Sequence, residues 1–255
     1  MCFGEKNRLA IPKIIHYCWF GGNPLPEDAK RYIATWRKFC PDYEIKEWNE
    51  SNFDINCCDY VREAYEAKKW AFVSDYARFY ILYQYGGVYF DTDVEMIRPL
   101  FSILQKGPFM GMEVNSPACV APGLGLAAIP GLKFYREVLD FYENRHFKQK
   151  NGKIDDTTIV VYVTNLLKKY GLKNGNKMQL IEGINIYPTE FFCPKNPSTG
   201  NLLITENTYT IHHYTASWFS PWQKFRHSVK INITLLFGEK FTQKLKILVK
   251  YFSRG

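Results

Sequence analysis

Residues 70–93 read WAFVSDYARFYILYQYGGVYFDTD, and this stretch decides the fold. Apolar side chains recur at helical spacing over 70–85, which predicts a helix with one largely apolar face. Gly86-Gly87 predicts the left-handed end of that helix and a turn. The apolar run that follows, 88–90, predicts a short buried strand that ends at Asp91. A helix that returns directly into a buried strand is typical of an α/β domain.

Two carboxylates, Asp91 and Asp93, stand at the carboxyl end of this strand, separated by one threonine. In an open α/β sheet, ligands bind beyond the carboxyl ends of the strands. Paired carboxylates there suit Mg²⁺ or Mn²⁺, and such an ion can neutralise the charge of a diphosphate. Acid pairs are also common on solvated turns, so the pair alone leaves both interpretations open.

Asp75 and Arg78 are three residues apart on the predicted helix, so they are neighbours on one of its faces. One interpretation is a surface ion pair that contributes little to stability. The other is a clamp for sugar hydroxyls, because the carboxylate accepts hydrogen bonds and the guanidinium donates them.

Outward from this stretch, strands and helices alternate, which favours an α/β sandwich. Further strands are predicted at 11–18, 43–49, 109–112, 119–121, within 179–192 and at 209–214. Further helices are predicted at 26–40, 58–67, 99–104, 131–145 and 157–170. No repeat or linker divides the chain before the basic tail, so we expect one domain over 1–220 followed by a tail over 221–255.

Residues 123–128 read GLGLAA, which fits the dinucleotide-binding pattern G-x-G-x-x-A. Its setting does not fit, because Pro122 abuts the first glycine and Pro130 would break the helix that the pattern requires. We therefore expect a mobile loop over a binding pocket here, since segments rich in proline and glycine serve as lids.

The blocks SDxxR at 74–78 and GGVYxDxD at 86–93 resemble glycosyltransferase family 32, which includes yeast initiating mannosyltransferases and bacterial capsule and O-antigen transferases. They are also similar to the glucosyltransferase domain of large clostridial toxins. The block IPKIIHYCWFGG at 11–22 resembles the first strand of these enzymes, and IHHYTASW at 211–218 resembles their C-terminal segment. Because the blocks occur in the family's order, the resemblance is specific, although 115–205 matches less clearly.

The resemblance implies a GT-A-like domain with a mixed central sheet flanked by helices. It implies transfer of a hexose from a nucleotide diphosphate sugar to an oligosaccharide or lipid-linked glycan, with retained configuration and Mn²⁺ or Mg²⁺ as the cofactor. UDP-hexose is favoured over GDP-mannose as the donor. The expected site residues are Trp19 against the base; Asp75 and Arg78 on the donor sugar; Tyr89 and Asp91 on the nucleotide and metal side; Asp91, Asp93 and His212 as metal ligands; Ser217 and Trp218 on the diphosphate. Asp75, Arg78, Asp91 and Asp93 form the expected catalytic set.

His212 is expected to bind the metal rather than His213. Successive side chains of a strand point to opposite faces, so the two rings cannot easily share one site. Ile211 is apolar and shares a face with His213, which assigns that face to packing. The resemblance agrees, because the family's histidine lies six residues before the tryptophan of Ser-Trp, as His212 does before Trp218. Trp19 and both histidines could instead be packed core residues.

Composition fits an enzyme with a sizeable core, since 46% of the 255 residues are hydrophobic and 17% are aromatic. The net charge of +8 is concentrated after residue 220, where eight basic residues accompany one acidic residue, Glu239. Residues 241, 245, 248, 249 and 252 form an apolar helical stripe, which predicts either peripheral membrane contact or a helix docked on the domain. Charge confined to a tail makes nucleic acid a poor candidate partner.

We expect a cytoplasmic protein, attached at most peripherally to the inner face of the membrane. The scattered cysteines show no metal-finger spacing, and no stretch reaches the roughly 18 apolar residues of a membrane span. Two other functions remain open. A metal-dependent phosphatase could use the Asp-x-Asp pair, although such enzymes place it after their first strand, and a non-catalytic nucleotide-sugar or glycan-binding module could retain the pocket.

Overall fold

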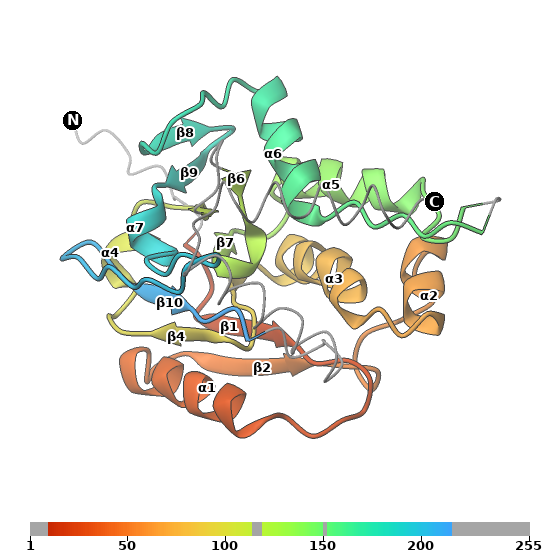
Figure 1. The fold of residues 1–255 in the computed structure, drawn as a ribbon, viewed down its shortest axis with the longest axis horizontal. Coiled ribbons are helices and arrows are strands. Elements are labelled where there is room, and N and C mark those ends of the chain that lie inside the picture. Colours follow the sequence, from red (N-terminus) through yellow and green to blue (C-terminus); the bar gives the residue numbers. More distant parts are fainter. Residues whose placement is uncertain (1–9, 114–118, 150–151, 216–255) are drawn as a thin grey trace, which may run out of the picture.

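The computed structural model describes residues 10–113, 119–149 and 152–215. Their centre is an eight-stranded mixed sheet with the strand order β2-β1-β3-β7-β5-β9-β8, in which β6 pairs with β5 (Figure 1). The strands are β1 (Ile14–Cys18), β2 (Glu44–Trp48), β3 (Gly87–Tyr89), β5 (Phe109–Glu113), β6 (Cys119–Val120), β7 (Leu126–Ala128), β8 (Gln179–Ile181) and β9 (Ile184–Tyr187). A separate two-stranded sheet pairs β4 (Val94–Met96) with β10 (Thr210–His212).

Helices cover both faces of the sheet. The helices are α1 (Glu27–Phe39), α2 (Asp59–Glu66), α3 (Trp70–Tyr85), α4 (Phe101–Leu104), α5 (Lys133–Glu143), α6 (Ile159–Lys169) and α7 (Thr189–Phe192), with a 3-10 turn η1 (Pro122–Leu124). One core joins the sheet to α2, α3, α5 and α6, and the other joins it to α1, α4, α7 and the small sheet. Val88 and Tyr89 face these two cores in turn, as strand geometry requires. The predicted α/β class, with a mixed central sheet flanked by helices, is confirmed.

The turn at Gly86–Gly87 connects the end of α3 to β3, which lies in the central sheet. Gly86 and Gly87 have φ of 65° and 95°, which side chains rarely adopt. A Cβ atom on Gly87 would also lie 2.7 Å from the Ile14 carbonyl oxygen. Only glycine at position 87 therefore allows β3 to lie against β1. Because the two strands are parallel, the residues that follow β3 lie next to the residues that follow β1.

The parallel strands set the direction of the site. β1 pairs in parallel with β3, and both β3 and β5 pair antiparallel with β7. The carboxyl ends of β1, β3 and β5 therefore lie at one edge of the sheet, where α/β proteins bind ligands.

The prediction for 123–128 is wrong in part. Leu126–Ala128 forms β7 in the middle of the sheet, fully buried between β3 and β5, rather than a loop. The run was too short to show a period, and its strand state depends on pairing with distant segments. Two further differences are β4, directly after the Asp-x-Asp pair, and α7, in a region where strands were predicted. The expected boundary between the domain and the basic tail, at residues 220 and 221, and the tail itself lie outside the described residues.

Candidate active site

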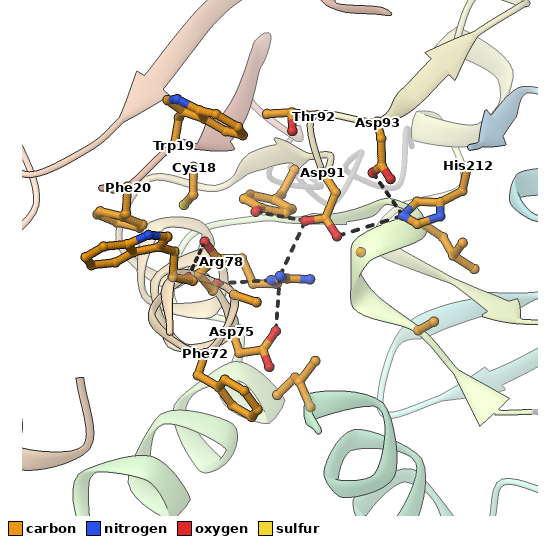
Figure 2. Close-up of a pocket in the computed structure, with 18 of the residues that line it drawn as sticks. Cys18, Trp19, Phe20, Phe72, Asp75, Arg78, Asp91, Thr92, Asp93 and His212 are labelled. Carbon is orange, nitrogen blue, oxygen red and sulfur yellow. Dashed lines mark hydrogen bonds and ion pairs between the residues drawn. The ribbon is translucent and has the colours of Figure 1, made fainter. Parts of the chain in front are cut away.

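A cavity of about 610 Å³ opens at the edge where β1 and β3 end. Figure 2 shows side chains from both strand ends, from α3 and from β10 pointing into it. Every expected site residue that the structure describes lines this cavity: Trp19, Asp75, Arg78, Tyr89, Asp91, Asp93 and His212. Ser217 and Trp218 lie outside the described residues, so their expected contact with a diphosphate stays a prediction.

Arg78 joins α3 to the Asp-x-Asp pair. Its Nη2 atom lies 3.1 Å from Oδ1 of Asp75 and 3.3 Å from Oδ1 of Asp91, and its Nε donates to the Ser74 carbonyl (Figure 2). The side chains of Arg78 and Asp75 are 5% and 12% exposed, so the surface ion pair considered from the sequence is wrong. A buried guanidinium held by two carboxylates has a fixed plane, which is what directional recognition of hydroxyls requires.

Tyr89 completes this cluster from β3. Its hydroxyl donates to Oδ1 of Asp91 at 3.0 Å, and its ring lies under the Arg78 guanidinium at 5.0 Å. Asp91 is thus oriented by a phenol and a guanidinium together. The opposite oxygen, Oδ2, is the one that faces His212.

Asp93 is buried and is held by the segment that follows β10. Its Oδ1 lies 3.2 Å from Nε2 of His212, and its Oδ2 accepts the Thr215 backbone N–H at 2.9 Å. Its backbone carbonyl accepts the His213 N–H. Because β10 pairs with β4, His212 is opposite Val94, next to the Asp-x-Asp pair.

His213 points away from the cavity. Its Nε2 bonds to Glu95 at 2.8 Å, and its ring stacks on Tyr32 with centroids 4.5 Å apart. The strand therefore separates the two rings as alternation predicts, with His212 towards the aspartates and His213 against α1.

The electrostatics of the site depend on these pairings. Burial raises the pKa of Asp75 to about 6, although the nearby Arg78 works in the opposite direction. For Asp93, burial also disfavours the charge, but His212 outweighs it and lowers the pKa of the carboxyl. For His212, burial disfavours the imidazolium, but Asp93 and Asp91 outweigh it and raise its pKa. The aspartates therefore stabilise a positive charge at the position of the ring.

The residues fit a divalent cation on chemical grounds. One ligand atom each from Asp91, Asp93 and His212 lies within 4.8 Å of the others. Two carboxylate oxygens and one imidazole nitrogen are a suitable donor set for Mn²⁺, and the carboxylates also suit Mg²⁺. Nδ1 of His212 is buried and has no hydrogen-bond partner among the described residues, which leaves Nε2 as the ring atom directed at the cluster.

Aromatic and proline side chains form the part of the cavity beyond β1. Trp19, partly buried, donates its Nε1–H to the Asn23 carbonyl at 2.6 Å, which fixes the indole plane. Phe20, Pro24 and Trp70 line the same part. A fixed indole at a cavity wall is suited to stacking on a nucleotide base.

The sequence motifs did not single out Glu113, which ends β5 and lines the cavity. Gly123, in the segment expected to lie over a binding pocket, also lines the cavity, and a Cβ atom added to it would lie 2.2 Å from Oδ2 of Asp91. The signal for Glu113 was present, because an acid directly after the apolar run 109–112 repeats the arrangement at Asp91.

Part of the chain that carries this site matches a known protein family. Residues 26–110 match the family model described as "Glycosyltransferase sugar-binding region containing DXD motif". The segment includes α3, β3 and the Asp91–Asp93 pair, but it ends before His212.

Similar proteins include two from the sequence comparison and one of known structure. Inositol phosphoceramide mannosyltransferase 3 of Schizosaccharomyces pombe is 37% identical over 108 residues, which are 39% of this chain and 29% of that protein's length. The uncharacterized glycosyltransferase L373 of Acanthamoeba polyphaga mimivirus is 24% identical over 82% of this chain and 84% of its own. Among solved structures, the PaToxG glycosyltransferase has a TM-score of 0.48 and 16% identity, over 62% of this chain and 69% of that one. The predicted resemblance is confirmed, since residues 26–110 match a DXD-containing sugar-binding region of glycosyltransferases, and the chain spans less than a third of the length of the mannosyltransferase that it matches.

Proposed function

We propose that the protein is a metal-dependent, retaining hexosyltransferase that uses a nucleotide diphosphate sugar, with UDP-hexose favoured over GDP-mannose. The acceptor in this proposal is an oligosaccharide or lipid-linked glycan, as in the synthesis of capsule, O-antigen or another surface polysaccharide. One observation carries the proposal. A single cavity joins a fixed aromatic wall at Trp19, the Asp75–Arg78 pair, and the cluster of Asp91, Asp93 and His212.

The residues divide the work of donor binding. Trp19 would stack on the base, while Asp75 and Arg78 would hold hydroxyls of the donor sugar. Asp91, Asp93 and His212 would hold Mn²⁺ or Mg²⁺, with Tyr89 orienting Asp91. When bound, such an ion supplies positive charge beside the diphosphate and so stabilises the leaving nucleotide.

The catalytic set has no carboxylate free of a cation. Asp75 and Asp91 share Arg78, and Asp93 pairs with His212. Pairing with a cation lowers the nucleophilicity of a carboxylate, and His212 also lowers the pKa of Asp93, which makes Asp93 a weak base. The arrangement therefore favours retention by a front-face route, in which the departing diphosphate helps to remove the proton of the acceptor hydroxyl.

The test is a donor-hydrolysis screen over UDP- and GDP-sugars with Mn²⁺, then with EDTA. Turnover should require the metal and disappear in Asp93→Asn, while Asp140→Asn, a change of an exposed carboxylate, should behave as the wild type. Undiminished turnover in EDTA would contradict the metal role. Release of phosphate from generic esters would favour the phosphatase, and tight binding of nucleotide and metal without turnover would favour the binding module.

Peripheral membrane contact through the tail at 221–255 is part of the proposal. None of the described helices is long and apolar enough to cross a bilayer. Removal of residues 238–255 should reduce binding to anionic vesicles and leave donor turnover intact. Equal vesicle binding by both proteins would dismiss this role.

A further inference from the structure

Three consecutive apolar side chains are exposed on the segment between α7 and β10, which projects from the body of the molecule in blue in Figure 1. Leu202, Leu203 and Ile204 are 48%, 73% and 52% exposed. No other run of three large apolar side chains is exposed in the part of the chain that the structure describes. Single exposed leucines are common on protein surfaces, whereas contiguous apolar patches mark contacts with proteins or membranes.

Hydrogen bonds hold this run in a hairpin formed by residues 194–204. The Leu203 N–H donates to the Pro194 carbonyl at 3.0 Å, which joins the two arms. At the tip, the side-chain oxygen of Asn196 accepts two backbone N–H groups, at 2.8 and 3.0 Å, as in an Asx turn. The hairpin therefore has a defined geometry that presents the three apolar side chains without burying them.

The hairpin is attached to the strand that carries His212. Lys195 donates from its Nζ to the His213 carbonyl at 3.3 Å. Sγ of Cys193, directly before the hairpin, lies 3.0 Å from the hydroxyl of Tyr214, which lines the active-site cavity. The hairpin therefore begins beside the cavity wall.

Charge favours a membrane as the partner of this surface. Lys195 is the only charged residue within 194–204, so the hairpin carries no carboxylate that anionic lipids would repel. The described chain ends at Thr215, close in sequence to the contact with Lys195, and the tail at 221–255 has eight basic residues and one acid. An apolar element and a basic segment are two signals that together attach a protein stably to a bilayer.

We propose that the hairpin 194–204 inserts Leu202, Leu203 and Ile204 into the interface of an anionic lipid bilayer, beside the contact made by the basic tail. This inference rests on the peripheral membrane contact in the proposed function and adds a second, apolar contact. It brings the cavity wall close to the bilayer surface, where a lipid-linked acceptor carries its sugar. An apolar contact does not depend on charge, so it should persist in salt that screens the tail.

The experiment compares two exposed leucines in the full-length protein. Leu203→Ser removes the most exposed side chain of the run, and Leu180→Ser removes a leucine of β8 that is 67% exposed. Leu180 is the matched control, because it lies opposite Asn185 near the start of β9, whereas the hairpin follows α7 beyond the end of β9.

Flotation with vesicles of phosphatidylcholine and phosphatidylglycerol measures membrane binding at low and at high salt. Thermal unfolding verifies that each variant is folded. Analytical ultracentrifugation gives the oligomeric state, and donor hydrolysis in water tests the proposed transferase function separately.

We expect Leu203→Ser to lower the vesicle partition coefficient roughly tenfold, the effect of losing one leucine side chain from an apolar phase. The same fold-change should appear at low and at high salt, although overall binding should fall with salt as the charge of the tail is screened. Leu180→Ser should bind vesicles as the wild type does. The unfolding temperature and donor hydrolysis should be unchanged in both variants, because both side chains are exposed and lie outside the cavity.

Wild-type vesicle binding by Leu203→Ser would overturn the inference while leaving the tail as the membrane contact. In that case, loss of a wild-type dimer in Leu203→Ser would assign the run to contact between copies of this chain. A lower unfolding temperature would instead assign it to the apolar stripe of the tail. Equal losses of binding in Leu203→Ser and Leu180→Ser would also overturn the inference, because the hairpin would then have no special role.

Absence of vesicle binding by the wild type would overturn this inference together with the membrane part of the proposed function. The transferase function would stand or fall on donor hydrolysis alone, which needs no membrane.

Discussion

Nη2 of Arg78 lies 3.3 Å from Oδ1 of Asp91, so a helix residue expected to bind the donor sugar also orients the first acid of the Asp-x-Asp pair. The contact joins two parts of the proposed site that the sequence presents as separate motifs. Sugar binding and metal binding should therefore depend on each other.

Arg78→Lys tests this dependence. A lysine keeps the charge but cannot bond to Asp75 and Asp91 in one plane, so donor turnover and Mn²⁺ affinity should both fall. Arg78→Ala should also unfold more easily, by about 3–5 kcal/mol, because it leaves two largely buried carboxylates unpaired. Urea denaturation and Mn²⁺ titration give the two quantities. Wild-type Mn²⁺ affinity in a folded Arg78→Lys would show that the two parts act independently.

Gly123→Ala should distort Asp91 directly. The new Cβ would lie 2.2 Å from Oδ2 of Asp91, so the carboxylate must move. We expect Mn²⁺ affinity to fall roughly tenfold or more, as when a ligand loses its orientation. Gly131→Ala is the control. Gly131 has a φ of 72°, so alanine would strain the backbone there, but the added Cβ would meet nothing within 4 Å. It should cost stability and leave Mn²⁺ binding unchanged; the opposite ranking would refute the close approach at Gly123.

His212→Ala should weaken Mn²⁺ binding at least about tenfold and reduce turnover, because it removes a proposed ligand. His213→Ala removes a ring that contacts Tyr32 and Glu95, so it should mainly lower thermal stability. The measurement is Mn²⁺ binding by electron paramagnetic resonance, with thermal unfolding in parallel. A greater loss of Mn²⁺ affinity in His213→Ala than in His212→Ala would show that His213, not His212, is the metal ligand.

Trp19→Ala should weaken nucleotide binding by roughly 1–3 kcal/mol, the contribution of one base stacked on an aromatic ring. Trp19 is only partly buried, so its loss should destabilise the fold less than the roughly 3–5 kcal/mol expected for a core tryptophan. Calorimetric titration with UDP and thermal unfolding separate the two effects. A large drop in the unfolding temperature with unchanged affinity would place Trp19 in the core.

His16 should make the fold sensitive to acid. Its Nδ1 accepts the Trp48 Nε1–H at 3.1 Å, so its Nε2–H donates to the Gly86 carbonyl at 3.0 Å, and the buried ring is neutral. Burial lowers its pKa from 6.5 to about 4. Between these values the unfolded chain binds a proton that the folded protein does not, so stability is full above pH 6.5 and falls as pH drops towards 4.

The lost stability should reach roughly 3 kcal/mol, from the size of the shift. It is measured by urea denaturation at several pH values, with His16→Asn as the comparison, since asparagine can accept from Trp48 without titrating. At neutral pH, His16→Asn should have a lower free energy of unfolding than the wild type, and this free energy should fall less on acidification than it does in the wild type. Parallel pH profiles for the two proteins would show that other groups cause the acid sensitivity.

The long elements could be predicted from the sequence, and the short ones could not. Helix α3 runs over Trp70–Tyr85 as its apolar spacing predicts, because sixteen residues show several turns of the pattern. Strands β4 and β7 have three residues each, too few for a period, and their pairing partners lie far along the chain. Their strand state is a property of the assembled sheet.

The candidate site residues that line the cavity are those for which motif and topology coincide. Asp91 and Asp93 follow a strand in the first motif, and the extended backbone at the end of β10 turns His212 and the next residue, His213, to opposite sides. Glu113 was not singled out, because its place at the end of an apolar run resembles that of Asp91 but only the assembled sheet shows that β5 ends at the edge where β3 ends. The bridging role of Arg78 depends on burial, which no spacing reveals.

The pairing of β4 with β10 has a consequence for biosynthesis. A nascent chain that has emerged only as far as residue 205 contains every strand of the large sheet and the whole DXD region, yet it lacks His212 and the Thr215 contact to Asp93. The proposed metal centre can therefore assemble only after nearly all of the described chain has left the ribosome. Until then Asp91 and Asp93 lack the imidazole, and a protein truncated before β10 should remain inert even if its sheet has formed.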